Sequence, residues 1–463
     1  MTTRPRHIAV IDIGKTNAKL ALVDLDTHTE IAVVTRPNNV LAGPPWPHFD
    51  TEGHWAFILT SLAAFHRDHR VDAISITTHG ASIVLLDKDG ALAAPILDYE
   101  HPIAADIAVD YDRQRPEFAQ TGSPRLANGL NVGAQLHYQF TVDPAVRLRT
   151  QHIVGYPQYW GHRLTGCAAN DVTSIGCHTD LWNPYAGTFS DLPHRLGITD
   201  KIAPVRKSTD ILGPILPHIA QQTGLSPQTP VVCGIHDSNA SLYPHLLTQD
   251  TPFSVVSTGT WVIVMTVGGA HPALDPDRDT LINVNAKGDA VPSARFMGGR
   301  EFELVQNGGA TEATAQDAQE VLDRDMMLLP SVVSDSGPFQ GRKMAWKGNE
   351  PARGSGPRYV ALSYYLALMT QTCLQLTAAN GPTIVEGPFA HNPHFLAMLS
   401  AATGRTVLKS QSQTGTSVGA ALLFGDSKGI ATPTAFTPAD NIPDLVAYAY
   451  AWQQRVNEGG ASK

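Results

Sequence analysis

The sequence predicts an α/β protein built from two domains of similar design. Each half of the chain opens with a strand–turn–strand unit, and each half ends in alternating strands and helices. The length of 463 residues points the same way, because one domain usually takes about 100–200 residues. No close sequence repeat relates the halves, so we expect them to share architecture only.

The first half contains five expected strands where apolar residues are bounded by turn residues: 7–13, 18–24, 30–35, 72–77 and 230–235. Apolar residues recur at helical spacing over 55–66, and a second helix is expected over 211–223. The Asp-Gly pair at 89–90 predicts a β-hairpin between 82–86 and 91–96.

The second half contains four expected strands: 252–257, 260–267, 383–386 and 406–409. Three helices are expected, over 359–379, over 394–403 and from about 415. The predicted domains are residues 1–243 and 244–463, and the tail from about 431 is expected to pack on the surface.

Composition and charge exclude several classes of protein. Hydrophobic residues make up 43% and charged residues 16%, as in packed globular chains. The net charge of -9, without a block of Lys or Arg, argues against a nucleic-acid partner. No run approaches the ~18 apolar residues of a membrane span, and no signal peptide or CxxC pair is visible. We therefore expect a cytoplasmic protein without membrane contact.

The segment DIGKTNAK at residues 12–19 places a carboxylate at a strand end, followed by a tight turn. Gly14 permits close backbone approach, and the side chains of Thr16 and Asn17 with the turn amides could hold a phosphate. Asp12 could hold Mg²⁺, which prefers one or two carboxylates plus phosphate oxygens. The alternative is a plain hairpin turn. The segment is not a Walker A loop, because GxxxxGK[ST] is absent.

The segment GIHDSNA at residues 234–240 ends an apolar strand and begins a helix with an acid, Asp237. Ligands of open α/β sheets bind beyond the carboxyl ends of strands, so Asp237 is placed to meet a substrate hydroxyl. The alternative is a carboxylate that caps the helix.

Three further segments have glycines at turns or helix starts. STGTW at 257–261 is either a second phosphate-binding turn or another hairpin, and 384–392 suits a nucleoside. The third segment, 413–421, begins a helix whose glycines allow close packing. Each is a weak signal alone, whereas their order along the chain is specific.

This order of segments resembles the FGGY family of carbohydrate kinases, over about residues 7–430. The stretches RLTG at 163–166 and DVTS at 171–174 are also similar to that family. The resemblance implies two ribonuclease-H-like domains of the actin/hexokinase type flanking a catalytic cleft. It also implies ATP-dependent phosphorylation of a hydroxyl on a small ketose or polyol, above all a deoxyketohexose or pentulose.

The resemblance also implies roles for residues. Asp237 corresponds to the catalytic base, and Asp12 and Asp237 to the ligands of Mg²⁺. The residues expected to bind ATP are Gly14, Thr16, Asn17, Lys19, Thr258, Gly259, Thr260, Gly298, Gly387, Asn392 and Gly415. The residues expected to bind the sugar are Thr78, His79, Gly80, Glu100, His236, Asp237 and Trp261.

Within the family, the His-Asp pair at 236–237 and the TGTW turn at 258–261 resemble the rhamnulokinase and fuculokinase branch. The THG stretch at 78–80 instead resembles the xylulose kinases. Two departures fall in the implied sugar pocket: DYEHP at 98–102 lacks the arginine of the family's W-N-D-x-R stretch, and PQY at 157–159 replaces Pro-x-Asp-Tyr. Both departures concern the substrate rather than the class of reaction.

Two other functions agree with parts of the sequence. One is an actin-like ATPase switch without sugar kinase activity, against which Asp237 and the THG stretch argue. The other is a metal hydrolase, suggested by nineteen histidines, but no HExxH motif exists and Pro393 separates His391 from His394. His79 as an internally satisfied histidine and Trp261 as a core aromatic also stay open. The expected partners are a small sugar and, as one option, a second copy in a homodimer.

Overall fold

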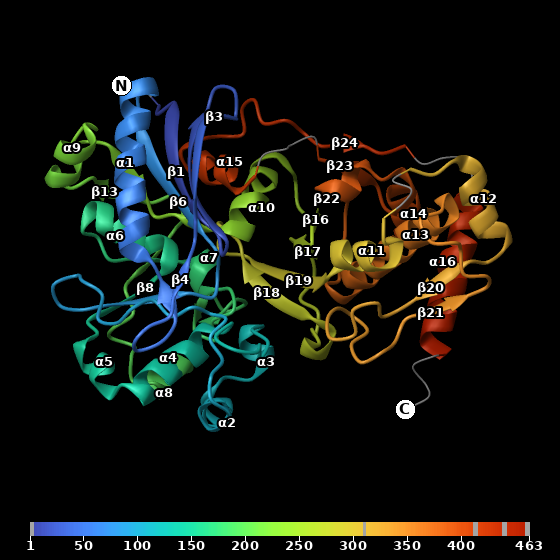
Figure 1. Cartoon of the computed structure of the whole chain (residues 1–463), viewed down its shortest axis with the longest axis horizontal. Helices are drawn as coiled ribbons and strands as arrows, with labels where there is room; N and C mark the ends of the chain where they lie inside the picture. The colour runs from blue at the N-terminus through green and yellow to red at the C-terminus, as the bar shows by residue number, and fades with distance from the viewer. Residues whose placement is uncertain (1–3, 309–311, 411–414, 438–441, 459–463) are drawn as a thin grey trace. The chain divides into compact units, whose positions relative to one another are not determined.

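A computed structural model of the chain describes residues 4–308, 312–410, 415–437 and 442–458 (Figure 1). The chain divides into two compact units that are not two continuous halves. The first comprises Met1–Gln249, Ile282–Ala290 and Thr414–Ile430, and the second comprises Asp250–Leu281, Val291–Gln413 and Ala431–Lys463. The segments 282–290 and 414–430 therefore belong with the N-terminal unit, which differs from the expected cut at residue 243.

The first unit is built on a mixed sheet of order β13-β14-β6-β1-β2-β3, with β15 also paired to β6. Its strands are β1 His7–Ile13, β2 Asn17–Asp24, β3 Thr29–Pro37, β6 Ala73–Thr78, β13 Ile211–Pro214, β14 Pro230–Val232 and β15 Ile235–His236. β1, β6 and β15 run parallel, with Ile13 and His236 both in register with Thr78. The next residues, Gly14, His79 and Asp237, consequently leave the sheet at one edge.

Helices cover both faces of this sheet. On one face, Ile74 and Ile76 of β6 join a buried core with residues of α1 Thr51–His69, α6 Tyr156–Thr165 and α9 Pro217–Thr223. On the other face, Ser75 donates a 2.7 Å hydrogen bond to the carbonyl of Ala420 in α15 Thr416–Ala421. α15 packs in turn on α10 Asp237–Thr248. A segment from late in the chain thus covers the first strands.

The rest of the first unit has a second buried core. Its helices are α2 Ala105–Gln114, α3 Phe118–Thr121, α4 Val132–Val142, α5 Pro144–Arg149, α7 Val172–Ile175, α8 Leu192–Arg195 and η3 Leu422–Phe424. Its short strands are β4 Val40–Leu41, β5 His48–Phe49, β7 Ile83–Leu86, β8 His152–Gly155, β9 Asn170–Asp171, β10 Trp182–Asn183, β11 Thr188–Phe189 and β12 Val205–Arg206.

One local prediction for the first unit is confirmed in part, and another is wrong. The Asp-Gly pair at 89–90 forms a turn with an antiparallel bridge between Leu86 and Leu92, and the amide of Ala93 bonds the carbonyl of Leu85, but β7 pairs along its length with β8. The predicted helix over 211–223 is wrong in its first half. Residues 211–214 form β13, which pairs with β14, and the helix begins only at Pro217, because a proline has no amide hydrogen to donate inside a helix.

The second unit is built on a sheet of order β18-β19-β17-β16-β22-β23-β24. Its strands are β16 Phe253–Thr258, β17 Val262–Val267, β18 Thr280–Val284, β19 Ala290–Phe296, β22 Thr383–Glu386, β23 Val407–Lys409 and β24 Thr434–Ala435, with β20 Met327–Leu329 and β21 Ala345–Lys347 outside it. Residues 282–284 of β18 are part of this sheet although they are grouped with the first unit. Its helices are α11 Gly298–Gln306, α12 Ala315–Asp323, α13 Gly356–Leu376, α14 Pro393–Thr403, α16 Ile442–Glu458, η1 Pro276–Arg278 and η2 Pro388–His391.

The long helix α13 is buried along most of its length and packs against α12 and α14, as its apolar sequence predicts. The tail after residue 431 is not a surface appendage. Leu445, Trp452 and Val456 of α16 are buried in the core of the second unit, and the indole of Trp452 donates a 2.7 Å hydrogen bond to the carbonyl of Leu328. Among the residues that the structure describes, none of the helices is long and apolar enough to span a bilayer.

Candidate functional site

The turn after β1 is tight and exposed. The amide of Gly14 donates a 2.9 Å hydrogen bond to the carbonyl of Asn17, and the Nδ2 of Asn38 donates to the carbonyl of Gly14 at 2.8 Å. Asn38 also bonds the carbonyl of Thr16 through its backbone amide at 2.9 Å. The side chains of Thr16 and Asn17 remain exposed on this braced turn. Its shape agrees with the expected phosphate-binding role and equally with a hairpin turn.

Asp12 lies at the end of β1 with one carboxylate oxygen already engaged. Its Oδ2 accepts hydrogen bonds from Thr416 Oγ1 at 2.6 Å and Ser417 Oγ at 3.3 Å, and lies 3.5 Å from Lys19 Nζ. Burial raises the pKa of Asp12, the bonds from Thr416 and Lys19 lower it, and the negative charge of Asp237 raises it. The two carboxylates thus act on each other, and a cation between them would relieve their repulsion.

This donor set fits Mg²⁺. Within the described ranges, no three or more His, Cys, Asp or Glu side chains gather into a group that could hold a metal ion by themselves. Mg²⁺ needs no such group, since one or two carboxylates suffice when phosphate oxygens and water complete its coordination. Asp12 and Asp237 are the residues that would hold it.

The sequence prediction missed Thr416 and Ser417 as partners of Asp12. It assigned Gly415 to ATP binding, which stays a prediction; the structure shows Gly415 immediately before α15, in the first unit. The available signal was the Thr-Ser pair at a helix start, which is typical of residues that bond through their hydroxyls.

Asp237 is the first residue of α10, and His236 occupies the position before the helix. The Oδ1 of Asp237 accepts a 2.6 Å hydrogen bond from the amide of Ser238 and lies 3.2 Å from His236 Nε2. The side chain remains about a third exposed, at 32%. The carboxylate therefore does not serve as the cap at the position before the helix, and it remains open to a ligand.

A buried network holds the chain in place just before Asp237. The amide of His236 donates a 2.9 Å hydrogen bond to Thr173 Oγ1. Thr173 Oγ1 in turn donates to Asp171 at 2.8 Å, and Ser208 Oγ donates to the same carboxylate at 2.6 Å. This network gives the DVTS stretch a physical role, because it fixes the backbone from which Asp237 projects.

His79 is a buried histidine with one nitrogen unused. Its amide bonds the carbonyl of Ile13 at 2.9 Å, and its Nδ1 lies 2.9 Å from the carbonyl of Gly80. Burial lowers the pKa of His79, so the ring is neutral at pH 7. A carbonyl can only accept, so Nδ1 carries the proton, and Nε2 is buried with no partner among the described residues. The ring is therefore not internally satisfied.

Gly80 is needed for space. A Cβ at this position would clash with Nε2 of His236. The glycine thus lets the imidazole of His236 lie beside the THG stretch. Thr78 is buried, and its hydroxyl donates a 3.0 Å hydrogen bond to the carbonyl of His79, so we expect it to shape the turn rather than to face a ligand.

A charged cluster beside His79 contains residues that the sequence prediction missed. Lys15 Nζ forms an ion pair with Asp98 and lies 3.2 Å from Glu100 Oε2 and 4.7 Å from the ring centroid of Tyr99. The ring of Tyr99 meets His79 edge-on at 5.2 Å. Burial and the nearby carboxylates raise the pKa of Tyr99 to about 12. Lys15 provides a cation next to Glu100, where the family's arginine is absent.

In the second unit, the turn after β16 lies against the start of α11. The amide of Gly259 bonds the carbonyl of Trp261 at 2.9 Å, and Thr260 is exposed. A Cβ at Gly299 would clash with the carbonyl of Gly259, and one at Gly298 would lie 2.5 Å from Val262. The two glycines therefore let a helix N-terminus approach the turn, an arrangement that favours anions.

Thr258 and Asn392 are engaged within the second unit. The hydroxyl of Thr258 donates to the carbonyl of Glu386 and accepts a 3.1 Å hydrogen bond from the amide of Phe389, which joins β16 to the loop at Gly387. Asn392 caps α14 by accepting from Phe395 at 3.0 Å, and its Nδ2 donates to Ser363 at 2.9 Å. These side chains hold the loop; any contact with a nucleotide would come from its backbone.

Trp261 is half-buried rather than a core residue. Its ring lies 4.9 Å from the guanidinium carbon of Arg295, which bonds Asp279 at 2.9 Å.

Glu386 and Gly387 precede the η2 turn, and Gly387 has a φ of 75°, which few other residues adopt.

Two α/β units, with two aspartates at the carboxyl edge of one sheet beside a tight glycine turn, agree with a sugar kinase of the two-domain class that the sequence resembles. The family model described as "FGGY family of carbohydrate kinases, N-terminal domain" matches residues 7–243. The model "Carbohydrate kinase FGGY, C-terminal domain" matches residues 250–433. The chain belongs to the FGGY family of carbohydrate kinases.

Similar proteins agree with this assignment. A carbohydrate kinase from Novosphingobium aromaticivorans is 37% identical with a TM-score of 0.89, over 97% of this chain and 100% of that one. A xylulose kinase from Lactobacillus acidophilus, 17% identical with a TM-score of 0.77 over 99% of each chain, shares the fold. The L-fuculokinase of Salmonella typhi is 25% identical over 270 residues, which span 57% of each chain.

Proposed function

We propose that this protein transfers the γ-phosphoryl group of ATP to a hydroxyl of a small ketose, a deoxyketohexose or pentulose. The observation that carries the proposal is the placement of Asp12 and Asp237 at the carboxyl edge of one sheet, where the negative charge of Asp237 raises the pKa of Asp12. The relatives named L-fuculokinase and xylulose kinase support a ketose as substrate.

Asp237 is the proposed general base. Phosphoryl transfer depends mostly on position and charge neutralisation, so the base only needs to receive the hydroxyl proton as the new bond forms. The contacts of Asp237 with Ser238 and His236 hold one oxygen, Oδ1, and direct the carboxylate from the start of α10. These contacts use only Oδ1, so the second carboxylate oxygen of Asp237 is available to a substrate hydroxyl.

Asp12 and Asp237 are the proposed ligands of Mg²⁺. When bound, Mg²⁺ neutralises charge on the phosphate oxygens of ATP. Burial raises the pKa of Asp12, and the hydrogen bond from Thr416 and the charge of Lys19 oppose this effect. The amides of the Gly14 turn would hold phosphate, as would the Gly259 turn of the second unit.

The sugar would lie against His79, Lys15 and Glu100. Nε2 of His79 accepts a hydrogen bond from a hydroxyl, Lys15 donates one, and Glu100 accepts one. A polyhydroxy compound matches this mixture of donors and acceptors. We propose that the first unit is the sugar-binding domain, that the second unit is the nucleotide-binding domain, and that the protein works in the cytoplasm.

The test is ADP release from Mg-ATP with a panel of deoxyketohexoses, pentuloses and polyols. We expect ADP only when a ketose is present, together with an equal amount of sugar phosphate by mass spectrometry. Steady ATP hydrolysis that no sugar changes would instead indicate an actin-like ATPase switch. A ketose that differs by one methyl group should react more slowly, since pockets discriminate such differences by about 1–3 kcal/mol.

A further inference from the structure

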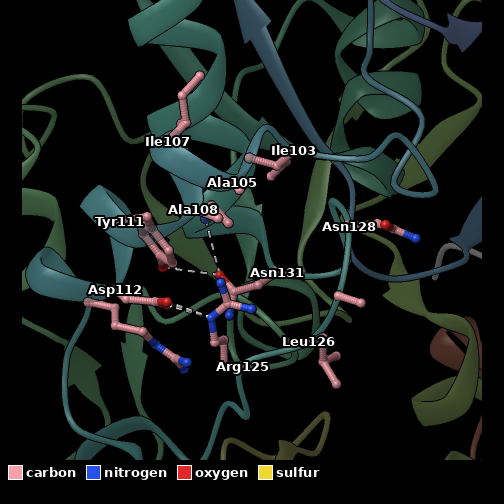
Figure 2. A pocket seen from close by; sticks show the side chains of 13 residues that line it. Ile103, Ala105, Ile107, Ala108, Tyr111, Asp112, Arg125, Leu126, Asn128 and Asn131 are labelled. Carbon is pink, nitrogen blue, oxygen red and sulfur yellow. Dashed lines mark hydrogen bonds and ion pairs between the residues drawn. The ribbon is translucent and has the colours of Figure 1, made fainter.

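A cavity of about 260 Å³ lies in the first unit, and neither Asp12 nor Asp237 lines it. Its walls come from α2, the loop over residues 125–131 and the first turn of α4 (Figure 2). We call it the α2–α4 cavity. Its volume is near the lower end of the roughly 300–1,000 Å³ of ligand pockets, so it suits a small molecule.

The buried polar atoms left over at this cavity are hydrogen-bond donors. Asn131 is 2% exposed, and its Nδ2 has no partner among the described residues; the same holds for Nε of Arg115. The Oδ1 of Asn131 is occupied, because it accepts from the amide of Ala134 at 3.3 Å; it also lies 3.1 Å from Tyr111 Oη, which donates its proton to Asp180. The missing partner is therefore an acceptor.

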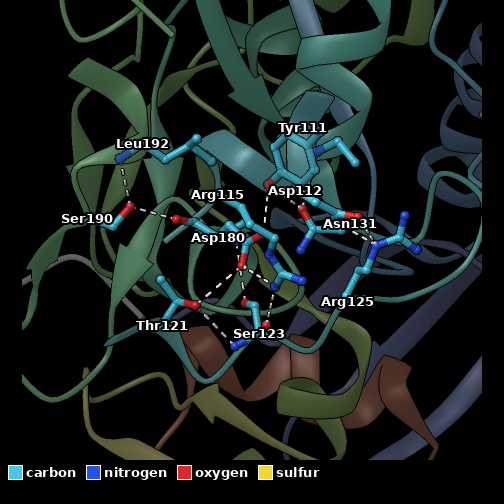
Figure 3. A network of polar contacts seen from close by, with 12 residues as sticks. Tyr111, Asp112, Arg115, Thr121, Ser123, Arg125, Asn131, Asp180, Ser190 and Leu192 are labelled. Carbon is cyan, nitrogen blue, oxygen red and sulfur yellow. Dashed lines mark hydrogen bonds and ion pairs between the residues drawn. The ribbon is translucent and has the colours of Figure 1, made fainter. Parts of the chain in front are cut away.

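Arg115 is held rigidly behind the cavity (Figure 3). Its Nη2 donates to Asp180 at 3.1 Å and to the carbonyl of Ser123 at 2.7 Å. Asp180 also accepts from Tyr111 at 2.6 Å and is fully buried. The network fixes the guanidinium, balances its charge and leaves Nε unused.

The opening of the cavity contains a second arginine. Arg125 Nε lies 2.7 Å from both oxygens of Asp112, and its side chain is half exposed. This pair uses only Nε, so the terminal nitrogens of Arg125 can meet another acceptor. The remaining walls are apolar and include Ile103, Ile107 and Leu126.

We propose that the α2–α4 cavity binds a small organic carboxylate. The carboxylate oxygens would accept from Asn131 Nδ2 and Arg115 Nε, and a short apolar body would lie along Ile107 and Leu126. Each arginine already has a carboxylate partner, so a monoanion leaves less uncompensated negative charge in the cavity than a phosphate dianion would. Apolar walls also disfavour such a strongly hydrated ion. The proposal is independent of the sugar kinase reaction.

Calorimetry and thermal melting with benzoate and butyrate, without ATP or sugar, test this proposal. We expect saturable binding of at least one acid and a higher melting temperature for the full chain. Butyramide should bind at least about tenfold more weakly, because it is uncharged and hydrogen bonds to charged groups are the stronger ones. Inorganic phosphate should also bind at least about tenfold more weakly, because it is strongly hydrated and the walls are apolar. Absence of saturable carboxylate binding, or tighter binding of phosphate, would overturn the proposal.

Variants locate the binding. Asn131→Asp keeps the oxygen that caps α4, but it loses the donor and adds a negative charge, so carboxylate binding should weaken at least about tenfold. Arg125→Gln, at a half-exposed position, should weaken it several-fold without unfolding the protein. Arg113→Gln on the exposed side of α2 is the control and should change nothing. Unchanged affinity in folded Asn131→Asp and Arg125→Gln would contradict the site.

Discussion

The hydroxyl of Thr416 donates a 2.6 Å hydrogen bond to Oδ2 of Asp12, across 404 positions of sequence. α15 can come this close because Gly419 has no side chain: a Cβ there would clash with the carbonyl of Ala240 in α10. The late segment therefore completes a site that the first strand begins. Its hydroxyl lowers the pKa of a carboxylate whose burial raises it.

Replacing Thr416 should reveal this bond through magnesium dependence. Thr416→Val keeps the size of the side chain but removes the donor, so the pKa of Asp12 should rise. We expect the Mg²⁺ concentration for half-maximal turnover to increase about tenfold, since a hydrogen bond to a charged group is worth roughly 1.5–3 kcal/mol. Thr188→Val, at an exposed position of β11, is the control. Unchanged magnesium dependence would mean that Thr416 only packs α15.

Gly80→Ala should impair catalysis through His236. The new methyl group would occupy the space of Nε2 of His236, so the imidazole must move away from Asp237. We expect turnover to fall at least about tenfold, since small displacements at a reacting centre are costly. His236→Ala should remove the clash. Turnover of Gly80→Ala/His236→Ala should then equal that of His236→Ala alone, whereas a further loss would show that Gly80 acts in another way.

Lys15→Met should weaken sugar binding. Its ammonium pairs with Asp98 and Glu100 beside the proposed sugar position. We expect the KM for the sugar to rise about tenfold, with little change in the KM for ATP. Because Asp98 is buried, Lys15→Met/Asp98→Asn keeps the fold testable when the single variant melts early. Lys88→Met at an exposed position is the control, and an unchanged sugar KM in the folded double variant would contradict this role.

Glu301 should make stability depend on pH. It is fully buried, bonds Tyr365 Oη at 3.0 Å and the amide of Val333 at 3.1 Å, and burial raises its pKa to about 7. Between the ordinary carboxyl pKa and about 7, the folded state holds more protons than the unfolded chain, so stability falls as pH rises. Glu301→Gln should melt higher than the wild type at pH 8 and similarly at pH 5. An equal difference at both pH values would contradict the raised pKa.

The strands and long helices could be predicted because their signals are local. The runs that form β1 and β22 have the predicted bounds, and α13 is the central helix that its apolar residues indicate. The hairpin at 89–90 forms only in part, with one bridge from Leu86 to Leu92, because pairing also depends on distant segments: β8 offers β7 a longer partner. No local pattern could show that preference.

The candidate site divides in the same way. Asp12, His79 and Asp237 could be found because each follows a strand at the sheet edge, where ligands of α/β proteins bind. Thr416 and Lys15 were missed because their roles depend on contacts with residues far along the chain. Sequence also could not show that folding uses the side chains of Thr258 and Asn392.

The central claim is that Asp237 accepts the proton of the sugar hydroxyl. Asp237→Asn keeps the size of the side chain and an oxygen for the amide of Ser238, so folding and ATP affinity should be preserved. Asp12→Asn is the comparison, and it should weaken magnesium dependence as well as turnover. The most direct test measures sugar phosphorylation and thermal melting on the same preparations. We predict that Asp237→Asn lowers turnover by about 10²–10⁴-fold at an unchanged melting temperature; a folded Asp237→Asn variant that retains most of its activity would contradict the account.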